Sequence, residues 1–212
     1  MKKSSAAKID RTTPDREEMI ERVTALVPSL AQRAEQVEKN RTIHPDTVQE
    51  FWDTQLWSIM KPRRYGGLEL DYSMLVDVPD YVARGCASTS WIYANLVIHD
   101  WMLAMWPPEA QDAVWKDNPR ALMASSLIPN AGRATPVAGG YRIAGRWPYC
   151  SGIDVSDWMM MAAMIQDDQS QRPIWLVAPR SEFEEIDTWH VSGLIGTGSR
   201  DVKCEDVFVP EF

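Results

Sequence analysis

Three residues at helical spacing, Trp91, Asn95 and His99, are the clearest candidates for chemistry in this sequence. Residues four positions apart lie on one face of a helix, so these side chains share a face of the segment 91–106. An imidazole exchanges a proton near neutral pH, which makes His99 a candidate acid or base. A histidine in an apolar helix is more often a hydrogen-bonded core residue, so both interpretations stand at this point.

A second candidate is the segment GRWPYCSGIDVSDW, residues 145–158, which lies between two runs that predict β-strands. It places Trp147 and Tyr149 beside the small polar side chains of Cys150 and Ser151. Aromatic walls with small polar groups are typical of a site for a planar ligand. The same residues also fit core aromatics followed by a turn. The ten tryptophans and eleven methionines of the chain are compatible with either interpretation.

The composition excludes several classes of function. A net charge of −8 over 212 residues argues against nucleic acid and anionic membranes as partners. No apolar run is long enough to span a bilayer, and no secretory signal is recognisable. The cysteines are far apart and the three histidines lack ligand spacing, so we expect no disulfide, no metal site and a cytoplasmic protein.

Helical periodicity dominates the first half of the chain. Thr12 or Thr13 is expected to cap a helix with Met19 and Val37 on its apolar face, kinked at Pro28. Further helices are predicted from 44 to about 57, from Asp71 or Ser73 to about 85, over 91–106 after a cap at 88–90, and over 109–117. The helix predicted over 91–106 is apolar nearly all round, which predicts burial.

From Arg120 onward, short β-rich runs are separated by turn residues, and Gly139-Gly140 predicts a hairpin. Helices followed by strands without alternation indicate an α+β fold. We expect a disordered segment 1–11, an N-terminal all-helical domain 12–119 and a β domain 120–212.

Other polar motifs are expected to be structural. GTGS, residues 196–199, has no following lysine or helix, so a turn between strands is favoured over a phosphate-binding loop. No G-x-G-x-x-G fingerprint is present. The remaining polar candidates are assigned to helix entry, strand end, turn or structural contact: His44, His190, Asp154, Asp157, Arg200 and Asp201.

Three segments in order, 99–115, 124–158 and 193–210, resemble the oxygenase components of two-component flavin-dependent aromatic hydroxylases. That family includes the p-hydroxyphenylacetate hydroxylase oxygenase and a steroid-degrading phenol hydroxylase. The resemblance implies an acyl-CoA dehydrogenase-like fold with an antiparallel β-barrel-like middle domain and a C-terminal helical bundle. The chain stops inside the middle domain, so we expect either a fragment or a natural truncation.

The resemblance implies a monooxygenase, an oxidoreductase that hydroxylates a phenolic substrate with O2. Reduced FMN or FAD would come from a separate NAD(P)H-dependent flavin reductase and react through a C4a-hydroperoxide. The protein would supply apolar walls that exclude water. The complete protein would be a homotetramer.

The resemblance also assigns individual residues. His99 would be the catalytic residue and would bind the substrate phenol together with Ser125. A hydroxyl near flavin N5 would fall at Cys150, a weak donor, with Ser151 one step on as the substitute. The expected flavin contacts are Trp91, Ser125, Ser126, Leu127, Pro148, Tyr149, Cys150 and Ser151.

Two other functions remain open. An acyl-CoA dehydrogenase shares the fold, but its acidic flavin segments are replaced here by ASSLIPNAGRA and PYCSG. A non-catalytic truncated homologue would leave a barrel edge and helix faces uncovered, and would need a partner. The sequence does not name the aromatic substrate and does not separate FMN from FAD.

Overall fold

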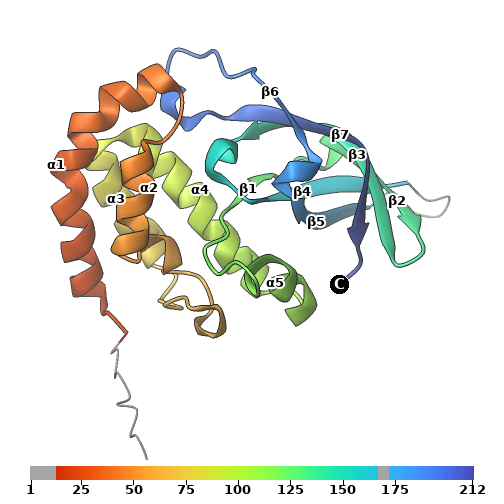
Figure 1. Cartoon of the computed structure of the whole chain (residues 1–212), viewed down its shortest axis with the longest axis horizontal. Helices are drawn as coiled ribbons and strands as arrows, with labels where there is room; N and C mark the ends of the chain where they lie inside the picture. Colours follow the sequence, from red (N-terminus) through yellow and green to blue (C-terminus); the bar gives the residue numbers. More distant parts are fainter. Residues whose placement is uncertain (1–12, 167–171) are drawn as a thin grey trace, which may run out of the picture.

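The computed structural model describes residues 13–166 and 172–212, with a helical layer packed beside a curled sheet (Figure 1). The predicted disorder of residues 1–11 lies outside the described residues. The helices are α1 (Arg16–Asn40), α2 (Pro45–Asp53), α3 (Met74–Gly85), α4 (Ala87–Ala104) and α5 (Pro108–Trp115). No helix within the described residues has an apolar run long enough to cross a bilayer.

The first helix begins later than expected. Asp15 caps α1, because its side chain accepts a hydrogen bond from the Glu18 amide, so the predicted cap at Thr13 is wrong. Thr12 lies outside the described residues. The helix runs through Pro28 without ending and buries the predicted stripe that begins at Met19.

The helix α4 begins four residues before the expected position. The residue preceding it is Cys86, whose side chain makes no capping bond, so the predicted cap at 88–90 is wrong. Ser88, Thr89 and Ser90 instead form its first turn, where Ser90 Oγ donates to the Pro79 carbonyl at 2.7 Å and Ser88 donates to Glu38. The turn is buried because α1 and α3 pack against it, so the hydroxyls of Ser88 and Ser90 bind those neighbours rather than their own helix.

The second helix is also shorter than expected, because α2 ends at Asp53 and a separate 3₁₀ turn covers Leu56–Ser58. Gln55 between them has a positive φ of 63°, which a continuous helix does not allow. The predicted entry role of His44 is confirmed, since its Nδ1 accepts a hydrogen bond from the Asp46 amide at 3.2 Å.

The second half of the chain forms a seven-stranded sheet in the order β1-β4-β2-β3-β7-β6, with β5 on β4. The strands are β1 (Met123–Ser126), β2 (Gly132–Val137), β3 (Gly140–Cys150), β4 (Trp158–Ile165), β5 (Pro173–Pro179), β6 (Glu184–Ile186) and β7 (Arg200–Pro210). The predicted α+β architecture is confirmed, because the helices α1 to α5 all precede the strands. The sheet is mixed rather than antiparallel throughout, because β4 runs parallel to both β1 and β2.

The predicted hairpin is confirmed as the antiparallel pair β2–β3. Its turn is shifted by one residue, because Ala138 and Gly139 form the loop and Gly140 already pairs with Val137. Gly139 has a φ of 80°, the left-handed conformation that a two-residue hairpin loop requires.

The helix α4 joins the two layers. Ile92 and Leu96 on it are buried in the same core cluster as Trp147 and Cys150 of β3, whereas Leu103 lies in a second cluster with α5 and β1. One helix therefore fixes the positions of the ends of β1 and β3, the two strands that carry the predicted site residues.

Candidate functional site

The imidazole of His99 joins α4 directly to β1. The ring is 3% exposed, and its Nδ1 lies 2.7 Å from the carbonyl oxygen of Met123. A carbonyl only accepts, so Nδ1 carries the proton. Burial lowers the pKa of His99 to about 4, which keeps the ring neutral at physiological pH. Nε2 is therefore a hydrogen-bond acceptor, and no protein group among the described residues bonds to it.

Ser125 lies on the same strand as the carbonyl that His99 contacts. It follows Met123 by two positions on β1, so both side chains point to the same face of the sheet, about 7 Å apart along the strand. Ser126 faces the other side and is buried, and its Oγ has no hydrogen-bond partner among the described residues. Leu127 is partly buried against the cluster that contains Leu103. The structure thus places His99 on the helix that contacts β1, the strand that carries Ser125.

A second group of polar atoms gathers at the start of α4. The Nε1 of Trp91 donates to Ser151 Oγ at 3.0 Å, although half of the Trp91 surface is exposed. Ser151 Oγ lies 2.7 Å from Ser199 Oγ, which lies 2.7 Å from Thr197 Oγ1. We call Ser151, Ser199 and Thr197 the hydroxyl chain. All three are buried, and the exposed indole ring of Trp91 covers one end of the group.

The aromatic residues of the segment 145–158 divide between the two interpretations. Trp147 is a core residue, fully buried, with its Nε1 donating to the Ala162 carbonyl at 2.7 Å. Tyr149 is 64% exposed and meets Trp189 edge-on at 6.2 Å between ring centroids. Pro148 between them is half-buried. One ring therefore belongs to the core and the other to the surface beside Trp189.

The side chain of Cys150 faces the core rather than this surface. It is fully buried, and its Sγ contacts the Trp147 carbonyl at 3.4 Å. Burial raises the pKa of the thiol to about 12, so the thiolate does not form at neutral pH. A bulge between Trp147 and Cys150 and the left-handed backbone of Tyr149, with φ 63°, break the strand alternation here. As a result Ser151, and not Cys150, meets Trp91.

A charged pair lies buried behind His99. Asp100 and Lys61 are each 1% exposed, and Lys61 Nζ lies 3.7 Å from Asp100 Oδ2. Lys61 also donates to the Pro119 carbonyl at 2.6 Å, while neither carboxylate oxygen has a hydrogen bond within the described residues. Burial raises the pKa of Asp100 to about 7, although Lys61 opposes the shift. No sequence pattern predicts this pair, because its members are 39 positions apart.

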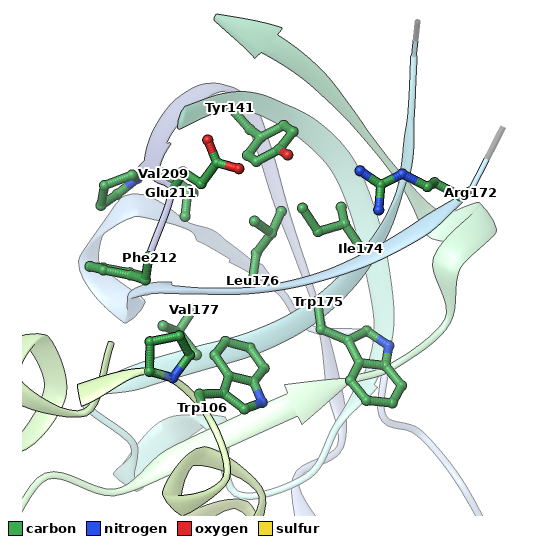
Figure 2. A pocket seen from close by; sticks show the side chains of 12 residues that line it. Trp106, Tyr141, Arg172, Ile174, Trp175, Leu176, Val177, Val209, Glu211 and Phe212 are labelled. Carbon is green, nitrogen blue, oxygen red and sulfur yellow. The ribbon is translucent and has the colours of Figure 1, made fainter. Parts of the chain in front are cut away.

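A well-formed cavity of about 290 Å³ lies elsewhere, between the end of α4 and the outer strand β5. Trp175 lies beside Trp106, while Leu176 lies on the other side of β5 with Tyr141 (Figure 2). None of the nine predicted site residues lines it. Trp91, Ser125 and Tyr149 line neither this cavity nor four further prominent hollows of residues 13–166 and 172–212, so a common cavity for these three residues stays a prediction.

Two site residues were missed from the sequence. Thr197 and Ser199 belong to the GTGS segment, which the structure confirms as a connection between β6 and β7. Adjacent small polar residues were the available signal, but nothing in the pattern showed that they would meet Ser151. No group of three or more His, Cys, Asp or Glu that could hold a metal occurs in the part of the chain that the structure describes.

Comparison with known proteins identifies similar sequences and structures. Residues 13–117 match the family model for the N-terminal domain of acyl-CoA dehydrogenases. The chain is 34% identical, over 93% of its length, to a pigment production hydroxylase of Rhodococcus sp., and it covers 51% of that protein. It is 35% identical, over 91% of its length, to the oxygenase component of an FADH2-dependent resorcinol hydroxylase from Rhizobium sp., covering 47% of it.

A solved structure agrees with these relatives. XiaF from Streptomyces sp., in complex with FADH2 and glycerol, is 34% identical with a TM-score of 0.84, and the match covers 92% of this chain and 50% of that one. The chain therefore spans about half the length of the proteins it matches.

Proposed function

We propose that this chain, whose relatives are oxygenase components of flavin-dependent hydroxylases and whose fold is acyl-CoA dehydrogenase-like, forms the flavin-facing half of such an oxygenase. The observation that carries the proposal is the hydrogen bond from Trp91 to Ser151. This hydrogen bond joins an exposed ring on α4 to a buried hydroxyl at the end of β3. The resemblance assigns flavin contacts both to this face of the helix and to this end of the strand. The substrate would be a phenol, and O2 the oxidant.

The polar atoms on this face fit a flavin. The ring system of a flavin is flat and apolar on its faces, with hydrogen-bonding atoms along its edges. Trp91 and Tyr149 offer exposed aromatic surface, and Ser151 offers a hydroxyl beside it. The buried hydroxyl of Ser126 has no partner among the described residues, so it can bond to an edge atom of a ligand at the end of β1. A bound reduced flavin supplies the activation of O2.

His99 would orient the phenol. Its Nδ1 is bonded to Met123, so its neutral Nε2 can accept a hydrogen bond from the phenol hydroxyl, with Ser125 two strand positions from Met123. A group with a pKa of about 4 is a poor acceptor for the proton of a phenol, whose pKa is about 10. We therefore assign His99 to binding and polarising the hydroxyl rather than to removing its proton completely.

The remaining parts of the proposal concern the whole protein. A separate NAD(P)H-dependent reductase would deliver reduced FMN or FAD, and the complete oxygenase would assemble as a homotetramer in the cytoplasm. Residues 12–119 and 120–212 would be its helical and β domains. Three buried free thiols are compatible with a reducing compartment.

The test supplies the complete protein with reduced flavin, isotopically labelled O2 and a panel of simple phenols. We expect one labelled oxygen atom in the product, and we expect His99→Ala to slow the reaction at least tenfold across pH 6 to 9, the usual effect of losing a positioned polar group. Transfer of no label, together with desaturation of an acyl thioester by the oxidised protein, would refute the proposal in favour of a dehydrogenase.

A further inference from the structure

The hydroxyl chain ends on a backbone carbonyl, and this end fixes its direction. Thr197 Oγ1 donates to the Leu194 carbonyl at 2.9 Å, because a carbonyl oxygen has no proton to give. Each hydroxyl has one proton. The hydroxyl proton of Thr197 is used in the bond to Leu194, so Thr197 Oγ1 accepts a hydrogen bond from Ser199 Oγ at 2.7 Å.

The same reasoning sets the next link. Ser199 has given its proton to Thr197, so it accepts the proton of Ser151 across 2.7 Å. At the other end, the indole N–H of Trp91 is a donor and Ser151 Oγ accepts it at 3.0 Å. Every bond along the line thus points from Trp91 toward Leu194, and the hydroxyl proton of Ser151 points inward.

The segment that carries Thr197 and Ser199 is held in place on both sides. A Cβ added to Gly196 would lie 2.4 Å from Val37 of α1 and 3.0 Å from Ser88 of α4, so the backbone touches both helices. Gly198 has a φ of 53°, which suits glycine. Packing therefore fixes Thr197 and Ser199, the two acceptors of the hydroxyl chain. As a result, the hydroxyl proton of Ser151 has one fixed direction.

We propose that Ser199 and Thr197 are positioning residues that hold Ser151 Oγ as a hydrogen-bond acceptor toward a ligand, so that the site prefers reduced flavin to oxidised flavin. This inference rests on the proposed function. The N5 atom of a reduced flavin carries a hydrogen and donates, whereas N5 of an oxidised flavin has a lone pair and accepts. A serine whose proton is committed inward can satisfy the first form and leaves the second without a donor.

The experiment measures the dissociation constants of the complete protein for reduced and for oxidised flavin, under anaerobic conditions, in wild type and Ser199→Ala. Removing the Ser199 hydroxyl frees the Ser151 proton to point outward. We expect the preference for the reduced form to fall about tenfold, equivalent to about a 30 mV shift in the two-electron potential of the bound flavin. A merely structural serine would weaken both forms equally and leave the ratio unchanged.

Two further variants keep the result interpretable. Ser199→Thr retains a hydroxyl, so it should keep the wild-type ratio of the two dissociation constants. This variant keeps the proposal testable if Ser199→Ala folds poorly. Ser156→Ala removes a buried hydroxyl that donates to the neighbouring Gly152 carbonyl at 2.8 Å, outside the hydroxyl chain, and should leave the ratio unchanged.

Three outcomes separate the two proposals. A lowered ratio in Ser199→Ala with restoration in Ser199→Thr supports the inference. A wild-type protein that binds flavin, with the same ratio in Ser199→Ala, overturns the inference and leaves the proposed function intact. A wild-type protein that binds flavin in neither state overturns both.

Discussion

The start and the middle of α4 hold polar groups in different surroundings. At its start, Trp91 meets the hydroxyl chain, where every polar atom is neutral and the bonds form a directed line. Nine residues later, Asp100 faces Lys61 with no hydrogen bond to either carboxylate oxygen among the described residues. Neutral hydroxyls keep their state at any ordinary pH, whereas a buried carboxyl changes charge.

The comparison separates ligand binding from stability. The start of α4 exposes aromatic surface, so substitutions there should change binding more than folding. His99 and Asp100 in the second half of α4 are buried, so substitutions there should change folding and its pH dependence. His99 belongs to the buried region by its environment and to the site by its free Nε2.

The largest effect is expected from Lys61→Met. It leaves Asp100 buried without its cation, which should cost about 3 to 5 kcal/mol of unfolding free energy above pH 7. Urea denaturation measures the loss. Lys116→Met, at an exposed lysine, is the control and should change little. The double variant Lys61→Met with Asp100→Leu should regain most of the loss, and a double variant as unstable as the single one would contradict this account.

The next effect concerns pH. The pKa of His99 is lowered from 6.5 to about 4, so the unfolded state binds more protons between these values and His99 makes stability rise with pH. The pKa of Asp100 is raised from 3.8 to about 7, so the folded state binds more protons and Asp100 makes stability fall over nearly the same range. The two neighbours therefore oppose each other.

Single variants should reveal each slope. Asp100→Asn removes the Asp100 titration and leaves only that of His99. The unfolding free energy of this variant relative to wild type should therefore rise by roughly 3 kcal/mol from pH 4 to 6.5. His99→Gln retains a donor for the Met123 carbonyl and leaves only the titration of Asp100. The unfolding free energy of this variant relative to wild type should therefore fall by a similar amount toward pH 7. Denaturation at half-unit pH intervals checks both. Parallel curves for both variants and wild type would show that the two groups do not oppose each other.

At the exposed end, Trp91→Ala should weaken the binding of reduced flavin about fivefold, because an aromatic contact contributes roughly 1 kcal/mol. Half of this ring is exposed, so unfolding free energy should change less than for a core tryptophan. Trp175→Ala is a matched control, at 53% exposure on β5 away from the site. Equal losses of binding in both variants would remove Trp91 from the site.

The smallest effect is expected from Tyr149→Gly. A left-handed φ of 63° is strained for tyrosine, and glycine adopts it freely, which offsets the flexibility that glycine adds to the unfolded chain. Unfolding free energy should change by less than about 1 kcal/mol, while reduced flavin binds more weakly because the ring beside Trp189 is gone. A loss of stability as large as that of Lys61→Met would show that Tyr149 is a core residue.

The sequence by itself determined the order of helices and strands, the apolar face of α1, the hairpin β2–β3 and the placing of Trp91 and His99 on one helix. These features depend on local periodicity and turn chemistry, which neighbouring residues specify. It also brought His99 and Ser125 into one hypothesis through the resemblance, and the structure places them on adjoining elements.

Tertiary structure decided the details on which the chemistry depends. The bulge in β3 turned Cys150 into the core and Ser151 toward Trp91, because one extra residue inverts the alternation of a strand. Packing of the turn at 195–197 against α1 and α4 brought Thr197 and Ser199 to Ser151 from 46 and 48 positions away. Contacts between residues so far apart in sequence leave no periodic pattern, since only the folded chain brings them within hydrogen-bond distance.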